Sequence, residues 1–308
     1  MKRKILNPTA DPVFKRIFGQ EKEITIEIIN LLINPPNPVI DLEYLPQEMF
    51  PDVSDGKISI VDVRCVDSMK QQFIIEMQVV HHEGFNQRAL MYAAKAYGQQ
   101  LKKGMFYNDA QPIYLLSIIN HAIKSDPQKW LHRAAMIDRT DPEFEIAGIN
   151  LIFLELTKRK KLGNFNFEDP VDRWLSFLIE PEKISNMTKF DLSVYPNLLK
   201  ATELLDESNY SQAQLDAYDR HLLAVYDINR SNIESYDRGH GEGKEEGIEI
   251  GEERGIKKGR EEGREEGFDI TLNLIDELEK GILSNEELAQ KYSKPLSVIE
   301  QLAAKFRK

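Results

Sequence analysis

The chain has 308 residues, of which 41% are hydrophobic and 30% charged, so it can form one large core with appendages or two domains. A net charge of −11 excludes a global basic field for nucleic acid, and such a role would need a local basic groove. A single cysteine, Cys65, excludes an internal disulfide and fits a reducing cytosol, and no apolar run is long enough to predict a membrane span.

The chain divides into regions that differ in composition and in predicted secondary structure. Residues 1–160 mix strand-like and helix-like segments, and residues 161–238 are helical with one polar side. Residues 239–267 form a repeat of glycine and charged residues, and residues 268–308 form a short helical tail. We therefore expect a core, a helical extension packed on that core, a linker or helix made by the repeat, and a small helical tail.

The first region predicts a helix followed by three strands. Residues 21–32 place isoleucine and leucine at helical spacing, and the prolines of "NPPNP" end that helix. Residues 39–45 alternate like a strand. Residues 57–67 and 71–80 also predict strands, and the polar stretch "DSMK" between them predicts a hairpin turn.

A helix and two further strands complete the predicted core. Residues 85–104 predict a helix that ends on Gly104. Residues 112–120 and 149–156 are continuous apolar runs, as expected for strands that are covered on both faces. This order of helices and strands predicts an α/β fold in which helices flank a mixed sheet. Beyond the core, apolar spacing within residues 169–238 predicts two or three helices packed on the sheet.

The predicted hairpin carries an acidic pair. Side chains two residues apart in a strand share a face, so Glu76 and Gln78 lie side by side in "FIIEMQVV". Counted from a turn centred on residues 68–69, Asp62 faces residue 75, and a bulge or a slightly different turn makes Glu76 its neighbour. Two close carboxylates repel each other unless a proton or a cation lies between them, and Mg²⁺ is commonly held by carboxylates, a carbonyl and waters. Spacing alone also fits a hairpin with one solvated face, on which these side chains form surface pairs.

Four stretches resemble the recombination-promoting nuclease and transposase-like family of the PD-(D/E)XK superfamily. They are "DPVFKRIFG" (11–19), "ISIVDVRCVD" (58–67), "FIIEMQ" (73–78) and "FNQRALMYAAKAYGQQLKKG" (85–104). The resemblance covers about residues 5–160, and a glycine-rich tail also occurs in this family. It implies a PD-(D/E)XK, restriction-endonuclease-like core in which Asp62 and Glu76 hold a Mg²⁺ or Mn²⁺ ion.

Gln78 stands where the superfamily motif has a lysine. A lysine would give a positive charge to the attacking water and the scissile phosphate, whereas a neutral amide gives only dipoles. By the resemblance, Lys15 could supply the missing charge from a helix above the sheet, and Asp11 or Glu27 could supply a further acidic group. For these three residues, a helix cap or a solvated helix face is the alternative.

The predicted helix at residues 85–104 offers three substrate-binding candidates, Arg88, Tyr92 and Gln99. Arg88 and Tyr92 are four residues apart and therefore share one helix face. An arginine can bind a phosphate through two parallel hydrogen bonds. A structural clip between Arg88 and a carboxylate of the sheet is the alternative.

Glycine recurs at every fourth position from Gly239 to Gly267, with mostly Glu, Lys and Arg between. Each glycine inside a helix costs about 1 kcal/mol relative to alanine, so these eight would cost roughly 8 kcal/mol. A flexible charged linker is therefore favoured for a free monomer. The alternative is a helix whose glycine row lets another helix approach closely.

The last segment, "SNEELAQKYSKPLSVIEQLAAKF", predicts a pair of helices joined by a turn. Ser284 is a helix cap with Glu287 three residues later, which is a capping box. The pair could bind nucleic acid, or it could only dimerise and make the protein a homo-oligomer. Its near-neutral charge does not favour strong phosphate binding.

With the resemblance, these features predict a cytoplasmic, metal-dependent DNA endonuclease that hydrolyses phosphodiester bonds, associated with recombination or transposase-like activity. The alternative is a catalytically weak nucleic-acid-binding or oligomerisation module that retains the nuclease fold. Metal-dependent nicking of DNA separates the two.

Overall fold

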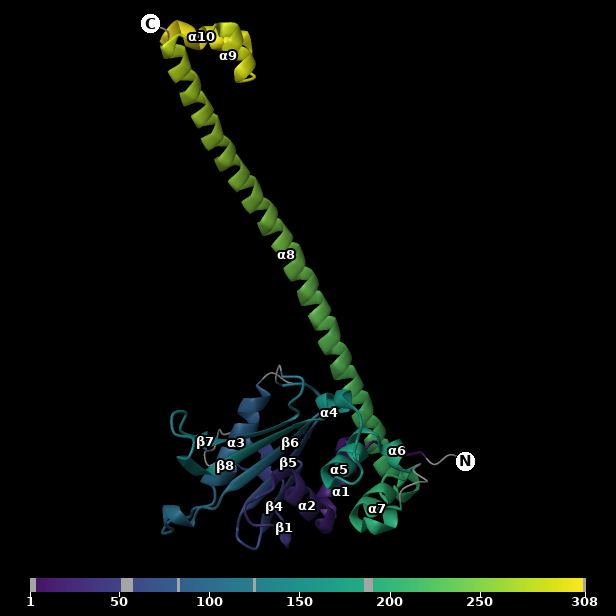
Figure 1. Cartoon of the computed structure of the whole chain (residues 1–308). Coiled ribbons are helices and arrows are strands. Elements are labelled where there is room, and N and C mark those ends of the chain that lie inside the picture. Colours follow the sequence, from purple (N-terminus) through teal and green to yellow (C-terminus); the bar gives the residue numbers. More distant parts are fainter. Residues whose placement is uncertain (1–3, 51–57, 82–83, 124–125, 186–190, 307–308) are drawn as a thin grey trace. The chain divides into compact units, whose positions relative to one another are not determined.

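Figure 1 shows the computed structural model of the chain, which divides into two units, Met1–Arg230 and Ser231–Lys308. The first unit contains every strand of the described residues, and the second contains helices only. The structure describes residues 4–50, 58–81, 84–123, 126–185 and 191–306.

A six-stranded mixed sheet forms the centre of the first unit, as predicted. Its strand order is β1-β4-β5-β6-β8-β7, in which β5, β6 and β8 run parallel and the remaining neighbours are antiparallel. A separate pair is formed by β2 and β3. The strands are β1 (Leu42–Tyr44), β2 (Glu48–Met49), β3 (Ser59–Ile60), β4 (Val63–Asp67), β5 (Gln72–Gln78), β6 (Ile113–Ile119), β7 (Leu131–Ile137) and β8 (Glu145–Glu155).

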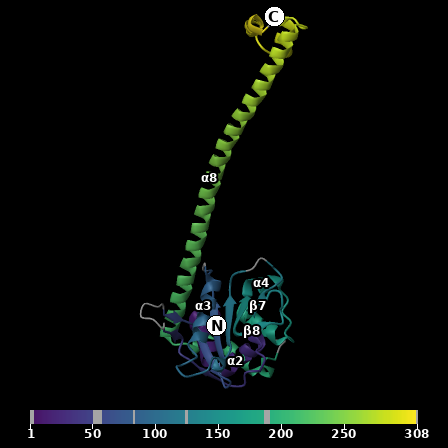
Figure 2. The ribbon, with the colours of Figure 1, turned by 90° about the vertical axis from the view of Figure 1, so that its left-hand side faces the viewer.

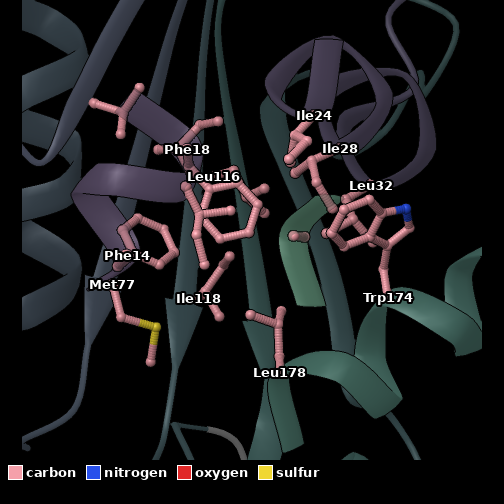
Figure 3. Close-up of a cluster of buried hydrophobic side chains, with 14 of the residues drawn as sticks. Phe14, Phe18, Ile24, Ile28, Leu32, Met77, Leu116, Ile118, Trp174 and Leu178 are labelled. Carbon is pink, nitrogen blue, oxygen red and sulfur yellow. The ribbon is translucent and has the colours of Figure 1, made fainter. Parts of the chain in front are cut away.

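Helices cover both faces of the sheet, with α3 on one face and α1, α2 and α5 on the other (Figure 1). Every residue of β6 is buried, which explains its continuous apolar run. Alternate residues of β6 face opposite helices, because Leu115 packs with α3 whereas Leu116 packs with α1. Figure 3 shows the second layer, with Phe14 and Phe18 beside Leu116 of β6.

Short helices after the sheet pack on the same core as α1. Trp174 of α5 is fully buried beside Ile24 and Ile28 of α2 (Figure 3). Asp169 caps α5 by accepting hydrogen bonds from two backbone N–H groups, and Pro170 begins the helix. The helices of the first unit before α8 are α1 (Asp11–Gln20), α2 (Lys22–Ile28, continued by a π-helical turn at Ile29–Ile33), α3 (Phe85–Gly98), α4 (Leu156–Leu162), α5 (Pro170–Ile179), α6 (Pro181–Ser185) and α7 (Pro196–Glu203).

Several predicted elements differ from the structure. The predicted strand at residues 57–67 is broken: β3 pairs with β2, the chain bends at Val61 and Asp62, and only β4 joins the large sheet. The predicted strand at residues 149–156 begins earlier, at Glu145, and is the longest of the sheet. Strand β7 was not predicted, because it is an edge strand whose last five residues are exposed and lack strict alternation of polar and apolar residues.

The helix predicted at residues 85–104 ends earlier, and its end at Gly104 is wrong. Helix α3 stops at Gly98. The side chain of Gln100 then forms two hydrogen bonds with the backbone of Gln111, of 2.8 and 2.9 Å. This reciprocal pair closes the loop that leads into β6, so the chain leaves the helix axis here.

A single helix, α8 (Gln212–Lys280), contains the whole glycine repeat, and Figure 2 follows it without a break. The flexible linker favoured from the sequence is therefore not what the structure has. A β-carbon added at any glycine from Gly239 to Gly267 would meet no atom within 4 Å. The repeat thus has no packing partner within the described chain.

A small helical cluster ends the second unit. The predicted helix pair is present as α9 (Asn285–Lys291) and α10 (Leu296–Phe306), and Ser284 and Glu287 form the predicted capping box. The apolar side chains of these helices and of the end of α8 form a core of their own, made by Leu274, Leu278, Leu288, Ile299 and Ala303. Among the described helices, none combines the length and the apolar character that crossing a membrane requires.

Candidate active site

The hairpin turn sets the register that brings the acidic pair together. Asp67 accepts hydrogen bonds on Oδ1 from the backbone N–H groups of Met69 and Gln71, and its own N–H donates to the Gln71 carbonyl. The turn is therefore centred on Met69, half a residue later than the predicted centre. Val63 consequently pairs with Ile75, and Asp62 lies opposite Glu76. Of the two predicted registers, the one that makes Asp62 and Glu76 neighbours is present.

Reciprocal hydrogen bonds fix the two carboxylates. The backbone N–H of Asp62 donates to Glu76 Oε1 at 3.1 Å, and the backbone N–H of Met77 donates to Asp62 Oδ2 at 2.8 Å. Asp62 can make this exchange because it lies in the break between β3 and β4, where its N–H is not used by the sheet. Glu76 is only 5% exposed and the Asp62 side chain 17%. The hydrogen bonds therefore hold both carboxylates in one orientation with little access to water.

Burial and mutual repulsion disfavour the charged form of both acids. Burial, and then the charge of Asp62, raise the pKa of Glu76 to about 8. Burial also raises the pKa of Asp62, although the Met77 N–H and the Lys15 ammonium oppose this rise. A cation between the two groups would remove the cost of ionising them. In the metal-free fold, ionising both carboxylates is therefore unfavourable.

Lys15 approaches the pair from α1, as predicted, and it brings Asp11 with it. Its Nζ lies 3.6 Å from Asp62 Oδ1 and 2.8 Å from Asp11 Oδ1. Burial lowers the pKa of Lys15. The two carboxylates raise this pKa by more than burial lowers it, so the pKa of Lys15 lies above its usual value. Of the two acidic candidates, Asp11 is the one near the pair. Glu27 lies elsewhere, because it accepts hydrogen bonds from Trp174 Nε1 and Asn197 Nδ2, both at 2.7 Å.

Gln78 links the acidic pair to α3. Its Nε2 donates to Glu76 Oε2 at 3.1 Å, and its Oε1 accepts a hydrogen bond from Arg88 Nη2. The two partners define which way the amide points, since a carboxylate needs a donor and a guanidinium needs an acceptor. Tyr92 lies one helical turn beyond Arg88, and burial followed by the charge of Glu76 raises its pKa. Arg88 and Tyr92 therefore line one side of the acidic pair.

Gln99 does not lie beside the acidic pair. It follows the last residue of α3, and its Nε2 donates to the Phe50 carbonyl at 2.7 Å. Seven residues separate it from Tyr92, which is about 10 Å along a helix. The structure therefore separates Gln99 from the other substrate-binding candidates.

Two residues near the site were not predicted. Ser117 is the partner of Glu76 in β6; it is fully buried, and its Oγ has no hydrogen-bond partner among the described residues. The only signal in the sequence is a serine within an apolar strand. His221, from the start of α8, accepts a hydrogen bond on Nε2 from the backbone N–H of Asp11 at 3.3 Å. It is distant in sequence, so no local pattern could have found it.

The donors fit a hard divalent cation held by few protein ligands. Within the described ranges, no group of three or more His, Cys, Asp or Glu side chains could hold a metal ion. Mg²⁺ commonly takes one or two carboxylates and completes its shell with carbonyls, waters and substrate phosphates. Asp62 and Glu76 offer such a carboxylate pair, and burial raises the pKa of each even though Lys15 lies 3.6 Å from Asp62.

The raised pKa of Glu76 predicts a pH dependence of stability in metal-free protein. Because the folded state keeps a proton that the unfolded chain releases above about pH 4.5, this contribution to stability is lost as the pH rises towards 8. We expect the melting temperature of the wild type to fall across this window relative to that of Glu76→Gln. Thermal melts in EDTA between pH 5 and 8 measure this difference. A constant difference would contradict the buried, protonated state of Glu76.

A comparison with known families matches most of the chain. The model of the PD-(D/E)XK nuclease family transposases matches residues 8–235, a range that includes all residues of the acidic pair and its neighbours. No curated protein and no solved structure gives a significant match. The match extends beyond the sheet into the start of α8.

Proposed function

Since the chain belongs to the PD-(D/E)XK nuclease family transposases, we propose that it is a DNA endonuclease that uses Mg²⁺ or Mn²⁺ to hydrolyse phosphodiester bonds. We place its activity in the cytoplasm, in recombination or transposase-like processing of DNA. One observation carries the proposal: Asp62 and Glu76 hold each other through reciprocal backbone hydrogen bonds at a buried place where ionising both carboxylates is unfavourable. We assign the nuclease core to residues 1–160 and a helical extension to residues 161–238.

Asp62 and Glu76 would hold the metal ion. When bound, such an ion polarises the phosphate and lowers the pKa of a bound water, which supplies the nucleophile. Arg88 would bind a non-bridging phosphate oxygen, because Gln78 already positions its guanidinium beside the acidic pair. Lys15 would supply, from α1, the positive charge that a lysine at position 78 would bring in the superfamily motif.

Nicking of supercoiled plasmid DNA tests this proposal. We expect cleavage in Mg²⁺ or Mn²⁺, no cleavage in EDTA, and a loss of at least about 100-fold in Asp62→Ala, because one of two metal-binding carboxylates is removed. Glu43→Ala is the matched control, since Glu43 is an exposed carboxylate on β1. Equal nicking by wild type and Asp62→Ala would contradict the proposed site.

A second experiment tests the amide of Gln78. Gln78→Ala removes the bridge between Glu76 and Arg88, so we expect nicking to slow by about 10- to 100-fold without unfolding of the protein. Gln78→Lys restores a cation beside the phosphate, and we expect it to retain or raise the rate. Nicking rates, with thermal melts as a folding control, measure both effects. A wild-type rate in Gln78→Ala would remove Gln78 from the mechanism.

A second candidate function follows from the same position. The amide at position 78 is neutral, so the chain could be a catalytically weak nucleic-acid-binding module that keeps the nuclease fold. In that case the protein binds DNA, and its binding weakens with salt, but it nicks no plasmid in either metal. The nicking assay thus decides between the two functions.

We also propose that the C-terminal region joins two copies of the chain. Residues 239–267 of helix α8 are mostly glycine and charged residues, and the glycines lower the stability of a lone helix by about 1 kcal/mol each. Interspersed Glu, Lys and Arg give the helix both charges, so a second copy offers complementary partners. The supporting observation is the open space beside each glycine of the repeat.

A further inference from the structure

A cavity of about 480 Å³ lies at the end of the sheet that carries the acidic pair. The residues before α1, the end of β6, and helices α4, α5 and α6 all contribute to its walls. All of these residues lie in the first unit. Its volume is within the range of pockets that hold small organic ligands.

The cavity is joined to the acidic site through two short backbone connections. Thr9, in its wall, precedes Asp11 by only two residues, and Asp11 binds Lys15. Asn120, also in its wall, donates its backbone N–H to the Gln78 carbonyl at 2.9 Å. These two connections link the cavity wall to Asp11 and Gln78, which are neighbours of the acidic pair.

The side chains beside the cavity pack in the core of the first unit. Figure 3 shows Leu178 of α5 pointing toward Ile118 of β6, with Met77 of β5 in the same layer. Leu178 lines the cavity, and the backbone N–H of Met77 holds Asp62. Met77 therefore contacts the layer beside the cavity with its side chain and Asp62 with its backbone, whereas Glu76 and Gln78 point to the α3 face of the sheet.

The walls combine apolar surfaces with amides. Leu156, Leu178, Ile179 and Pro181 give apolar contact to a bound ligand, such as a nucleobase. Asn7 accepts hydrogen bonds on Oδ1 from the N–H and hydroxyl of Thr9, at 3.0 and 2.8 Å, which leaves its amide N–H groups to donate. The Asn120 side chain adds a donor and an acceptor.

The charged residues of the walls are Lys160, Glu180, Glu182 and Lys183. Lys183 binds Glu180 at 2.7 Å, so these two charges neutralise each other. Lys160 lies in the wall on α4, it is exposed, and its Nζ has no ion-pair partner within the part of the chain that the structure describes. The cavity therefore offers apolar contact, amide groups and the ammonium of Lys160, with the carboxylate of Glu182 also in its wall. The apolar contact, the amides and Lys160 match a base and its phosphate.

We propose that this cavity binds one nucleotide of the DNA strand next to the cleaved phosphate. The base lies between the apolar walls, Asn7 and Asn120 bind its edge, and Lys160 binds its phosphate. Enzymes that take a base out of the stack lose stacking energy, and a shaped pocket returns part of that energy. The inference rests on the proposed nuclease function for the source of the nucleotide, but the cavity itself does not require cleavage.

Binding of deoxyadenosine monophosphate tests the cavity without any cleavage. We expect saturable binding by titration calorimetry in the full-length wild type, and at least a tenfold higher Kd in Lys160→Ala and in Asn120→Ala. Lys161→Ala is the matched control, because Lys161 is exposed on the same helix but does not line the cavity. Inorganic phosphate and deoxyadenosine alone should bind more weakly than the nucleotide, since each lacks one half of the contacts.

DNA that carries 2-aminopurine tests the strand as the source. In EDTA, binding of such DNA to the wild type should raise the fluorescence at one position, because the base leaves the stack. Lys160→Ala and Asn120→Ala should lose this rise, and Lys161→Ala should keep it. An unchanged fluorescence together with nucleotide binding would overturn the DNA assignment in favour of a free nucleotide.

Other outcomes separate this proposal from the nuclease proposal. Nucleotide binding that is absent, or equal in all variants, overturns the cavity assignment even if plasmid nicking is strong. If the wild type does not nick plasmid DNA but binds the nucleotide in a way that depends on Lys160 and Asn120, the nuclease function is overturned. The cavity then remains a nucleotide site.

Discussion

Mg²⁺ or Mn²⁺ is expected to raise the melting temperature of the sheet-containing unit by about 5–10 °C at a concentration near 100 times the Kd. This follows because binding to the folded state alone adds about 2.7 kcal/mol at that concentration, and 1 kcal/mol shifts a domain of this size by about 2–4 °C. Both tryptophans, Trp130 and Trp174, lie in the first unit, so their fluorescence reports its melting without a contribution from the tail.

The double variant Asp62→Asn, Glu76→Gln should lose this shift. Without metal it should melt above the wild type at pH 8, because two buried groups that repel each other when ionised have become neutral. Glu43→Gln, Glu145→Gln is the matched control, since it removes two exposed carboxylates from strands of the same sheet. Equal metal shifts in wild type and in Asp62→Asn, Glu76→Gln would place the ion elsewhere.

If the double variant gains stability and loses metal binding, the acidic pair serves metal binding at the expense of the stability of the metal-free protein. Buried carboxylates raise each other's pKa and destabilise the metal-free fold, and only a bound cation reverses that cost. A hairpin with one solvated face, the alternative from spacing alone, has no such cost. The burial of Glu76 at 5% exposure therefore argues against the surface-pair alternative.

How far the sequence predicts this site depends on the distance between the residues in the chain. The period of two in β5 placed Glu76 and Gln78 on one face, and the hairpin placed Asp62 near them. The turn centre could not be fixed from "DSMK", because the choice depends on hydrogen bonds that Asp67 makes within the turn. Asp11 and Glu27 could not be told apart, because the partners of Glu27 come from α5 and α7, far along the chain.

The errors in the fold have related causes. The α/β class was confirmed because long apolar runs such as that of β6 predict buried strands. Strand β7 was missed because it lies at the edge of the sheet and its exposed side chains leave no alternation. Gln99 binds the Phe50 carbonyl, a contact between residues 49 apart that no local pattern predicts. The end of α3 was misplaced because the Gln100–Gln111 pair that follows it links residues eleven apart.

The glycine repeat shows the limit of propensity arguments. Eight glycines weaken a lone helix by roughly 8 kcal/mol, yet the segment lies inside the 69-residue helix α8. A fourfold spacing drifts by about 40° per step around a helix, because 3.6 residues make one turn. The row of glycines is therefore a stripe that winds slowly around α8. A repeat longer than 3.6 residues favours a right-handed supercoil, so two copies that follow their stripes would coil in that sense.

Replacing Gly247, Gly251, Gly255 and Gly259 with alanine tests the pairing of two copies. In one chain the new methyl groups meet no atom within 4 Å, and alanine favours the helix by about 1 kcal/mol at each site, so helix content should be kept or raised. Between two helices the same methyl groups fill the stripe and force the backbones apart. We therefore expect the variant to dissociate into monomers while its circular dichroism keeps the helical signal.

The matched control adds alanine away from the stripe. Glu249, Glu253, Lys257 and Glu261 each follow one of the four glycines by two residues, which places them about 200° around the helix. Replacing these four with alanine should leave the mass measured by light scattering unchanged, because the stripe stays open. Dissociation of the control alone would assign the pairing to the charged side chains, and an unchanged mass in the glycine variant would refute packing through the stripe.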